Sequence, residues 1–271
     1  MKTLITSLPF ALHAIALLVT LALAELFPTN FGLILCFPAY PLTLALSAGL
    51  VSRCVASQVT PGRFLRDPGT SLYRGRMIYG AAWTSLYYCK PVLHLLLSCP
   101  PLKAMVFRLF GYKGSLDFTI YPDSWIRDLR LLDFGPGTYI ANRATLGTNH
   151  VRSDGKIQVG GIKTGCKVII GHLAMVGGGT HIGDNSEVGC AAKVGFMVRI
   201  GSDVSIGPDA VVDSGTRVMG RVHIGARAYI GKRCVIHEGV RIPAGATIPD
   251  RSVIYCAADI PAVQSSQHLA A

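Results

Sequence analysis

Isoleucine or valine occupies every sixth position of this chain from residue 170 to residue 254. Glycine often follows directly, and a small or β-branched residue lies four positions after each of them. A period of six fits neither the α-helix, with about 3.6 residues per turn, nor a simple two-faced strand. The pattern therefore predicts a short unit that repeats, with one inward-facing slot in each unit. The slots are Ile170, Val176, Ile182, Val188, Val194, Ile200, Ile206, Val212, Val218, Ile224, Ile230, Ile236, Ile242, Ile248 and Ile254.

One such unit cannot close on itself, but three can form the faces of a narrow prism. A large residue points inward, a small one lies beside it, and glycine, which tolerates positive φ, suits the corner. Three six-residue faces make a coil of eighteen residues, and stacked coils form parallel hydrogen-bonded ladders. We therefore predict an all-β parallel β-helix domain over residues 113–258.

Two uncharged stretches, Leu4–Ala24 and Leu26–Ser52, precede the repeat. Each is long enough for the roughly 20 residues that cross a bilayer, and the short segment Glu25–Asn30 between them contains a proline. The pattern predicts a transmembrane helical hairpin over residues 1–56. An alternative is a cleaved signal peptide ending at Ala24, but only Lys2 marks its basic region, and the second stretch would still anchor the protein.

Arginines are concentrated directly after this hairpin, and Asp67 is the only acidic residue among them. The arginines are Arg53, Arg63, Arg66, Arg74 and Arg76. Cytoplasmic flanks of membrane helices carry such an excess of basic residues. We therefore expect an inner-membrane protein whose N-terminus and β-helix domain face the cytoplasm.

Residues 57–112 are apolar and aromatic, with lysine and arginine between the apolar runs. Tryptophan and tyrosine favour the depth of the lipid headgroups, so we expect helices that lie on the membrane surface or dip into it, interrupted at Pro100–Pro101. Two roles remain open for them: presenting a membrane-bound or lipid-linked substrate, and anchoring alone. Residues 259–271 form a polar segment that predicts a flexible tail.

The net charge of +11 indicates that the protein binds anionic partners. No basic run with interleaved aromatic residues is present, so we expect no nucleic acid. Anionic headgroups and the phosphates of a coenzyme A-type donor explain the charge better. The eight cysteines are scattered without a CxxC motif, which indicates reduced thiols and no disulfide framework.

The repeat breaks once, over residues 148–159. A polar excursion from a stiff coil exposes its side chains, and His150 lies at its head. An imidazole can take a proton from a hydroxyl or amine that attacks a thioester. We therefore predict that His150 is a general base.

The slot pattern over residues 118–255 and the string Ala144–Asp154 resemble the hexapeptide-repeat acyltransferases. More closely, the entry segment 107–113 and the loop resemble membrane-anchored modules at the ends of some non-ribosomal peptide and poly-lysine synthetases. The resemblance implies a left-handed β-helix, a homotrimer, and acyl-CoA, with acetyl-CoA first, as donor substrate. Those modules follow the histidine with an acidic pair, whereas Val151 and Arg152 follow it here.

Two sets of contact residues complete the predicted site. One coil before His150, Asp128 and Asp133 are the acidic candidates to support it. The predicted acceptor-binding residues are Asp128, Asn142, Asn149 and Asp154. His172 and Cys190, eighteen residues apart, should stack on one edge beside the loop, and related enzymes contact pantetheine there. The predicted donor-binding residues are His172, Cys190, Lys193, Arg199 and Arg217.

These features favour a membrane-anchored O- or N-acetyltransferase whose acceptor is a small molecule, a lipid-linked group or a carrier-bound group. Two alternatives remain: a non-catalytic β-helix scaffold that docks a partner enzyme, and a γ-type carbonic anhydrase. The carbonic anhydrases of this fold have two histidines five positions apart, whereas His172 and His181 of this chain are nine apart. We predict no metal.

Overall fold

The structure is a computed structural model that describes residues 2–261, with side chains from residue 5 onward. The chain divides into two units. The helical unit comprises Met1–Lys113, Arg127–Leu132 and Val151–Ile157, and the solenoid unit comprises Gly114–Ile126, Asp133–His150 and the chain from Gln158 onward. Residues 262–271, most of the predicted tail, lie outside the described range.

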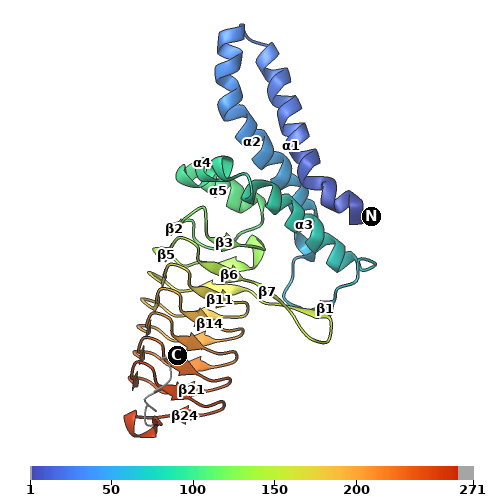
Figure 1. Cartoon of the computed structure of the whole chain (residues 1–271). Coiled ribbons are helices and arrows are strands. Elements are labelled where there is room, and N and C mark those ends of the chain that lie inside the picture. The colour runs from blue at the N-terminus through green and yellow to red at the C-terminus, as the bar shows by residue number, and fades with distance from the viewer. Residues whose placement is uncertain (1, 262–271) are drawn as a thin grey trace, which may run out of the picture. The chain divides into compact units, whose positions relative to one another are not determined.

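The solenoid is a parallel β-helix, as predicted (Figure 1), with three seven-stranded sheets as its faces. Its handedness, which the resemblance implies to be left, stays a prediction. The β2 face consists of β2 (Phe118–Ile120), β5 (Thr138–Ile140), β10 (Ile169–Ile170), β13 (Glu187–Val188), β16 (Ser205–Ile206), β19 (His223–Ile224) and β22 (Arg241–Ile242). The β3 face consists of β3 (Trp125–Ile126), β6 (Thr145–Gly147), β11 (Met175–Gly177), β14 (Lys193–Val194), β17 (Val211–Val212), β20 (Tyr229–Ile230) and β23 (Thr247–Ile248). The β4 face consists of β4 (Leu132–Asp133), β9 (Ile162–Thr164), β12 (His181–Ile182), β15 (Arg199–Ile200), β18 (Arg217–Val218), β21 (Val235–Ile236) and β24 (Val253–Ile254).

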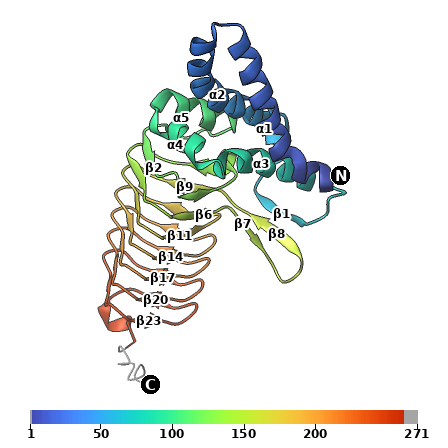
Figure 2. The ribbon, with the colours of Figure 1, turned by 45° about the horizontal axis from the view of Figure 1, so that its top comes forward.

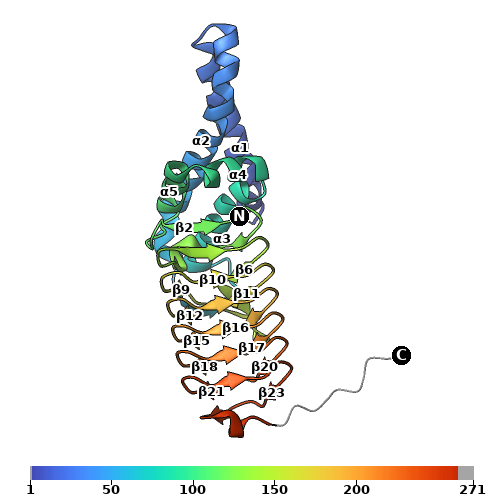
Figure 3. The same cartoon turned by 90° about the vertical axis from the view of Figure 1, so that its left-hand side faces the viewer.

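The inward slots form the core of the solenoid. All fifteen predicted slot residues are buried, and the most exposed of them, Ile200, is 5% exposed. From residue 169 onward, strands of successive coils pair in register eighteen residues apart, for example Met175 with Lys193 and His181 with Arg199. In the first coil the separation is twenty, as for Trp125 with Thr145. Figure 3 shows these strands stacked coil upon coil. The period of six and the eighteen-residue coil are confirmed. A 3-10 helix, η3 (Ala257–Asp259), follows the last strand.

The predicted reason for the glycines is wrong. Glycines directly after the slots, such as Gly183, do not have positive φ; the left-handed backbone occurs two residues later, for example at Asn185 with φ 53°. A Cβ on Gly183 would lie 2.5 Å from the backbone carbon of Gly201 in the next coil. Glycine is needed there because two backbones approach closely, and not because the chain turns.

The single interruption of the repeat is a β-hairpin and not an open loop. Thr145 pairs with Met175, thirty positions away instead of eighteen, so twelve extra residues leave the coil. They contain β7 (Asn149–Val151) and β8 (Lys156–Val159), and β1 (Gly62–Leu65) pairs with β8. Figure 2 shows these three strands side by side. The expected polar excursion is therefore only partly right, because Ile157 and Val159 are buried.

The helical unit begins with two long antiparallel helices, α1 (Lys2–Glu25) and α2 (Thr29–Val55) (Figure 1). Both are long and apolar enough to cross a membrane. His13 of α1 is held inside the unit, where Nδ1 lies 2.7 Å from the Tyr40 hydroxyl and Nε2 lies 3.1 Å from the Ser85 carbonyl oxygen. The short helix η1 (Ala56–Gln58) follows α2 and leads to β1.

Three further helices complete the unit: α3 (Ser71–Tyr87), α4 (Lys90–Ser98) and α5 (Pro100–Leu109). The prolines interrupt this region as predicted, because α4 and α5 meet at an angle of 112°. Tyr79 and Trp83 of α3 are buried and pack against Phe110. Both side chains therefore belong to the core of the unit, whereas Tyr88 is 68% exposed. The expected position of this region at the membrane surface stays a prediction. The 3-10 helix η2 (Leu129–Leu131) also belongs to the helical unit.

A glycine substitution tests the close approach of the coils. We expect Gly183→Ala to lower the free energy of unfolding by about 2–3 kcal/mol, because its Cβ would overlap the backbone of the next coil. Gly239→Ala is the matched control: its φ is +73° and a Cβ there meets no atom within 4 Å, so it should cost only about 1 kcal/mol of backbone strain. Thermal unfolding in detergent measures both, and equal losses would contradict this explanation.

Candidate functional site

The hairpin places His150 at the surface of the solenoid. The coil leaves the prism after Gly147, the last residue of β6, and Thr148 is still fully buried. The Gly160 amide donates a 2.8 Å hydrogen bond to the Thr148 carbonyl oxygen, which closes the neck of the insertion. His150, two residues beyond this neck, is exposed. A rigid coil therefore fixes the point at which the imidazole emerges.

A cavity of about 550 Å³ lies on the outer side of the β3 face, and His150 is part of its wall. It extends over five successive strands of that face, from β3 to β17. Since neighbouring strands are about 4.8 Å apart, the groove runs for about 19 Å along the solenoid axis. It is lined by Trp125, Thr145, Gly147, Asn149, His150, Met175, Val176, Gly177, Lys193, Val194, Gly195, Phe196, Val211, Val212 and Asp213.

Phe196 is the direct neighbour of the imidazole. The two ring centroids are 5.1 Å apart, with 41° between the ring planes. The backbone holds this ring in place, because the Phe196 amide donates a 3.0 Å hydrogen bond to Ser214 Oγ. On the next strand of the hairpin, Gln158 Nε2 lies 3.3 Å from Met197 Sδ. Within the part of the chain that the structure describes, no side chain hydrogen-bonds the imidazole, so its nitrogens remain accessible to a ligand.

The predicted acceptor-binding residues do not lie together. Asn149 lines the cavity beside His150. Asn142 lies at the corner between β5 and β6, outside the cavity wall, with its Oδ1 buried and without a hydrogen-bond partner among the described residues. Asp154 belongs to the tip of the hairpin, where its Oδ1 accepts a 3.0 Å hydrogen bond from the Lys156 amide. That bond, with the charge of Arg152, holds the pKa of Asp154 below its usual range.

Asp128 is buried in the helical unit, and this contradicts its predicted contact with the acceptor. Its side chain is fully buried, and Arg76 Nη2 donates a 2.5 Å hydrogen bond to Oδ2. Arg76 itself is only 4% exposed. The carboxylate therefore neutralises a buried guanidinium and has no contact with solvent. Asp133, the other acidic candidate, is exposed and forms an ion pair of 3.5 Å with Lys163.

Of the predicted donor-binding residues, Lys193 alone lines the cavity among the described residues. His172 and Cys190 occupy equivalent corners of successive coils, as predicted, and the Ala191 amide bonds to the His172 carbonyl oxygen. However, these corners precede β11 and β14, whereas the hairpin leaves after β6. The whole width of the β3 face separates the two edges, so the expectation that they lie beside the loop is wrong.

Arg199 and Arg217 lie on the β4 face and not in this cavity. They pair in register and line a separate groove of about 370 Å³. His181 pairs with Arg199 in the same column. Burial, and then the charges of Arg199 and Lys163, lower the pKa of His181. His181 is therefore biased toward its neutral form, and the column carries its positive charge on Lys163, Arg199 and Arg217.

Sequence reasoning missed three large side chains in the cavity wall: Trp125, Met175 and Phe196. Trp125 and Met175 each directly precede an inward residue, so they point outward on the same face as Lys193. The sequence did not reveal that these residues share a face, because the twelve inserted residues shift the register between Thr145 and Met175. The signal for Phe196 was an aromatic residue at a corner position otherwise occupied by small or polar residues.

Among residues 5–261, no group of three or more His, Cys, Asp or Glu side chains is arranged to hold a metal ion.

No model of a known protein family and no curated protein matches the chain. A hexapeptide transferase family protein from Anaplasma phagocytophilum is a similar solved structure, with 16% identity over 50% of this chain and 80% of that one, and a TM-score of 0.26. Serine acetyltransferase isoform 3 from Entamoeba histolytica has 14% identity over 94% and 72%, and a TM-score of 0.26. UDP-N-acetylglucosamine acyltransferase from Campylobacter jejuni has 15% identity over 50% and 66%, and a TM-score of 0.17. At these values the likeness carries no argument about the activity of this chain.

The buried position of Asp128 is open to direct test. We expect Asp128→Asn to destabilise the helical unit by about 3–5 kcal/mol, because the Arg76 guanidinium would stay buried without its counter-charge. Asparagine adopts the left-handed backbone of this residue readily, so only the charge changes. Asp133→Asn, in an exposed pair, should cost less than about 1 kcal/mol. If thermal unfolding found Asp128→Asn as stable as the parent, the buried pair would be refuted.

Proposed function

We propose that this protein is a membrane-anchored acyltransferase that moves an acyl group from acyl-CoA to a hydroxyl or amine acceptor. His150 acts as the general base. The observation that carries the proposal is an exposed imidazole in the wall of a 550 Å³ groove, at the one point where a rigid coil is interrupted. Cavities of about 300–1,000 Å³ are typical of small-molecule sites. The contacts that His150 makes within the solenoid unit support this function. The membrane anchor, the acyl donor and the acceptor are part of what we propose.

The groove suits the pantetheine arm of a coenzyme A thioester. Its length of about 19 Å runs along apolar side chains, including Met175 and Val211. Lys193 supplies an ammonium group that can pair with a donor phosphate. Acetyl-CoA is the first candidate for the donor substrate. We retain His172, Cys190, Arg199 and Arg217 as donor contacts only in a trimer, where the face of a neighbouring subunit would cover the groove.

The chemistry needs one proton transfer in each direction. The acceptor donates a hydrogen bond from its O–H or N–H to an imidazole nitrogen of His150. As that proton moves to His150, the acceptor oxygen or nitrogen bonds to the thioester carbonyl carbon and forms a tetrahedral intermediate. The intermediate collapses, the carbon–sulfur bond breaks, and the imidazolium returns its proton to the departing thiolate. Backbone amides near the coil corners stabilise the oxyanion in this scheme.

The acceptor is proposed to bind at the end of the groove near Asn149, whose amide is next to His150 and can orient a hydroxyl or amine. Trp125 and Thr145 form the neighbouring part of the wall. We propose an acceptor that resides at the cytoplasmic face of the membrane, such as a sugar, a lipid headgroup or a lipid-linked amine. The two apolar helices α1 and α2 would keep the enzyme at that surface.

Replacing His150 tests the role of the base. We expect His150→Ala to reduce acyl transfer from radiolabelled acetyl-CoA to membrane acceptors by about 10²–10⁴-fold. Thermal stabilisation by coenzyme A should remain, because the imidazole is needed for proton transfer and not for binding the donor. His223→Ala, at another exposed position of the solenoid, is the matched control and should retain activity.

Three outcomes would contradict the proposal. Full activity in His150→Ala would exclude the imidazole as base. Absence of both acyl transfer and stabilisation by coenzyme A in the parent protein would favour the scaffold alternative. Stoichiometric zinc in elemental analysis, with hydration of carbon dioxide, would instead favour the carbonic anhydrase.

A further inference from the structure

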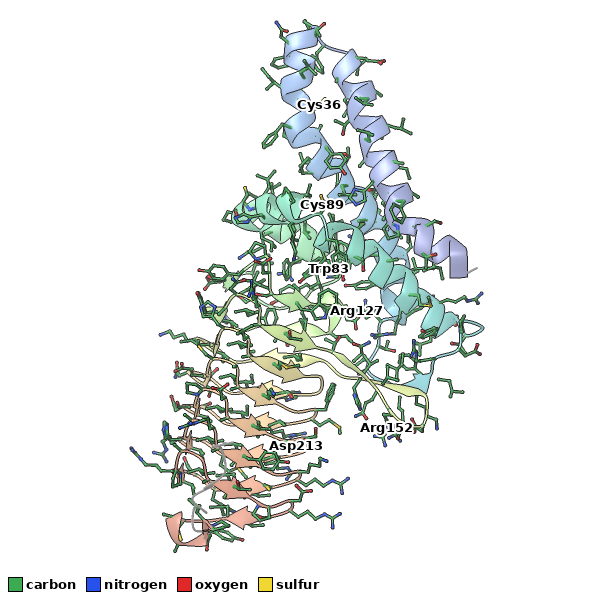
Figure 4. All side chains as sticks on the ribbon, viewed as in Figure 1. Cys36, Trp83, Cys89, Arg127, Arg152 and Asp213 are labelled. Carbon is green, nitrogen blue, oxygen red and sulfur yellow. The ribbon has the colours of Figure 1, made fainter. Side chains whose placement is uncertain are left out.

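A basic surface is assembled from two segments about ninety residues apart. Strand β1 and the residue after it supply two arginines, and the hairpin supplies an arginine and a lysine. We call this group, Arg63, Arg66, Arg152 and Lys156, the basic hairpin patch. All four residues belong to the helical unit, and Figure 4 shows Arg152 near the outer end of the hairpin. The pairing of β1 with β8 brings the two segments together.

The inner side of this small sheet is fixed by packing. Phe64 of β1 lies beneath the guanidinium of Arg76, 5.7 Å from the ring centroid. Arg76 is in turn held by Asp128, and Ile157 of β8 is buried. Since side chains alternate along a strand, Arg63 and Leu65 must point away from this core. Leu65 is 57% exposed and Val151, beside the patch, is 47% exposed.

The acidic neighbours of the patch are occupied by local backbone bonds. Asp67 Oδ1 accepts a 2.8 Å hydrogen bond from the Gly69 amide, and Asp154 Oδ1 accepts one from the Lys156 amide. Both carboxylates stabilise turns. Asp154 also lies 3.7 Å from Arg152, and the charges of Arg63 and Lys156 act on it as well. The patch therefore keeps an excess of positive charge beside two exposed aliphatic side chains. Basic and apolar groups side by side are typical of surfaces that bind anionic bilayers.

The patch is within reach of the membrane. Helix α2 ends at Val55, and β1 begins at Gly62. Seven residues of extended chain span at most about 25 Å. This length is the greatest distance at which β1 can lie from the end of α2. Helix α2 is one of the two helices long enough to cross a bilayer.

We propose that the basic hairpin patch binds the anionic bilayer surface, with its charges on lipid phosphates and with Leu65 and Val151 entering the headgroup layer. Residue 151 directly follows His150, so this contact would hold the catalytic strand β7 at the membrane and order it there. The lipid contact itself is independent of the proposed function; its consequence for catalysis rests on that function.

Hydrogen exchange in lipid nanodiscs tests the contact without any assay of activity. The full chain is placed in discs of phosphatidylcholine alone and in discs with added phosphatidylglycerol. We expect amides of residues 149–157 to exchange at least roughly tenfold more slowly in the anionic discs, because binding stabilises the closed sheet. High salt should abolish the difference by screening the charges.

Matched variants decide whether the patch is responsible. The patch variant carries Arg63→Gln, Arg66→Gln, Arg152→Gln and Lys156→Gln. The control variant removes four exposed charges from the C-terminal coils of the solenoid: Arg227→Gln, Arg233→Gln, Arg241→Gln and Arg251→Gln. The patch variant should lose the slower exchange, and the control should keep it.

Several results would overturn the proposal. These are equal exchange in the two kinds of disc, equal loss in both variants, or the same protection by inorganic phosphate in phosphatidylcholine discs, which would assign the patch to a soluble anion. Thermal unfolding separates a folding defect from a loss of lipid contact; if the patch variant is unstable, the single variant Arg152→Gln in the same discs decides the question. Loss of protection with retained acyl transfer would leave the proposed function standing.

Discussion

The close stacking of backbones in the solenoid is the constraint on which the rest of the structure depends. From residue 169 onward each coil closes in eighteen residues, so that each inward residue lies above its equivalent in the next coil. The glycine after a slot has no room for a side chain, because the next coil passes within contact distance. The first coil takes two extra residues, since Trp125 pairs with Thr145, but the coil after it has twelve, since Thr145 pairs with Met175. The twelve inserted residues therefore leave the prism through one neck, and everything chemical about this chain follows from where that neck lies.

The neck determines which outward residues the imidazole meets. It opens beside the β3 face, whose outward column contains aromatic, aliphatic and basic side chains. Phe196 and Lys193 come from a coil that the sequence places more than forty positions after His150, yet stacking brings them to its side. The arrangement combines a titratable group, an apolar groove and one cation on a rigid frame. In the proposed acyl transfer these features would supply the base, a surface for the pantetheine arm and a partner for a donor phosphate, and the frame would contribute position alone.

A second, independent interaction organises the helical unit. The Arg76–Asp128 pair is buried, and it links α3 to the segment 127–132, which the chain contributes from the first coil. Burial of such a pair costs desolvation energy, so it is retained for geometry more readily than for stability. It also supports Phe64 and hence β1. The strand that carries His150, β7, is therefore part of a three-stranded sheet whose other edge strand is β1.

Much of this fold could be predicted from the sequence. The inward residues recur at a fixed period, which predicts the core of the β-helix, and the length of the apolar stretches predicts the two long helices. The hairpin was not readable, since its partner β1 lies about ninety residues earlier. The stacking of His172 on Cys190 follows from spacing, but the edge on which they lie depends on how three faces close around the insertion. Asp128 precedes His150 by about one coil, yet its backbone turns it into the helical unit. Sequence distance alone cannot distinguish these directions.

The most direct measurement is a cryo-electron microscopy structure of the full chain in nanodiscs with bound coenzyme A. We expect the pantetheine arm to lie along the β3 face between Trp125 and Asp213, with its sulfur within about 5 Å of the His150 imidazole. Coenzyme A bound on another face, with His150 remote from the thiol, would contradict the proposed role of His150.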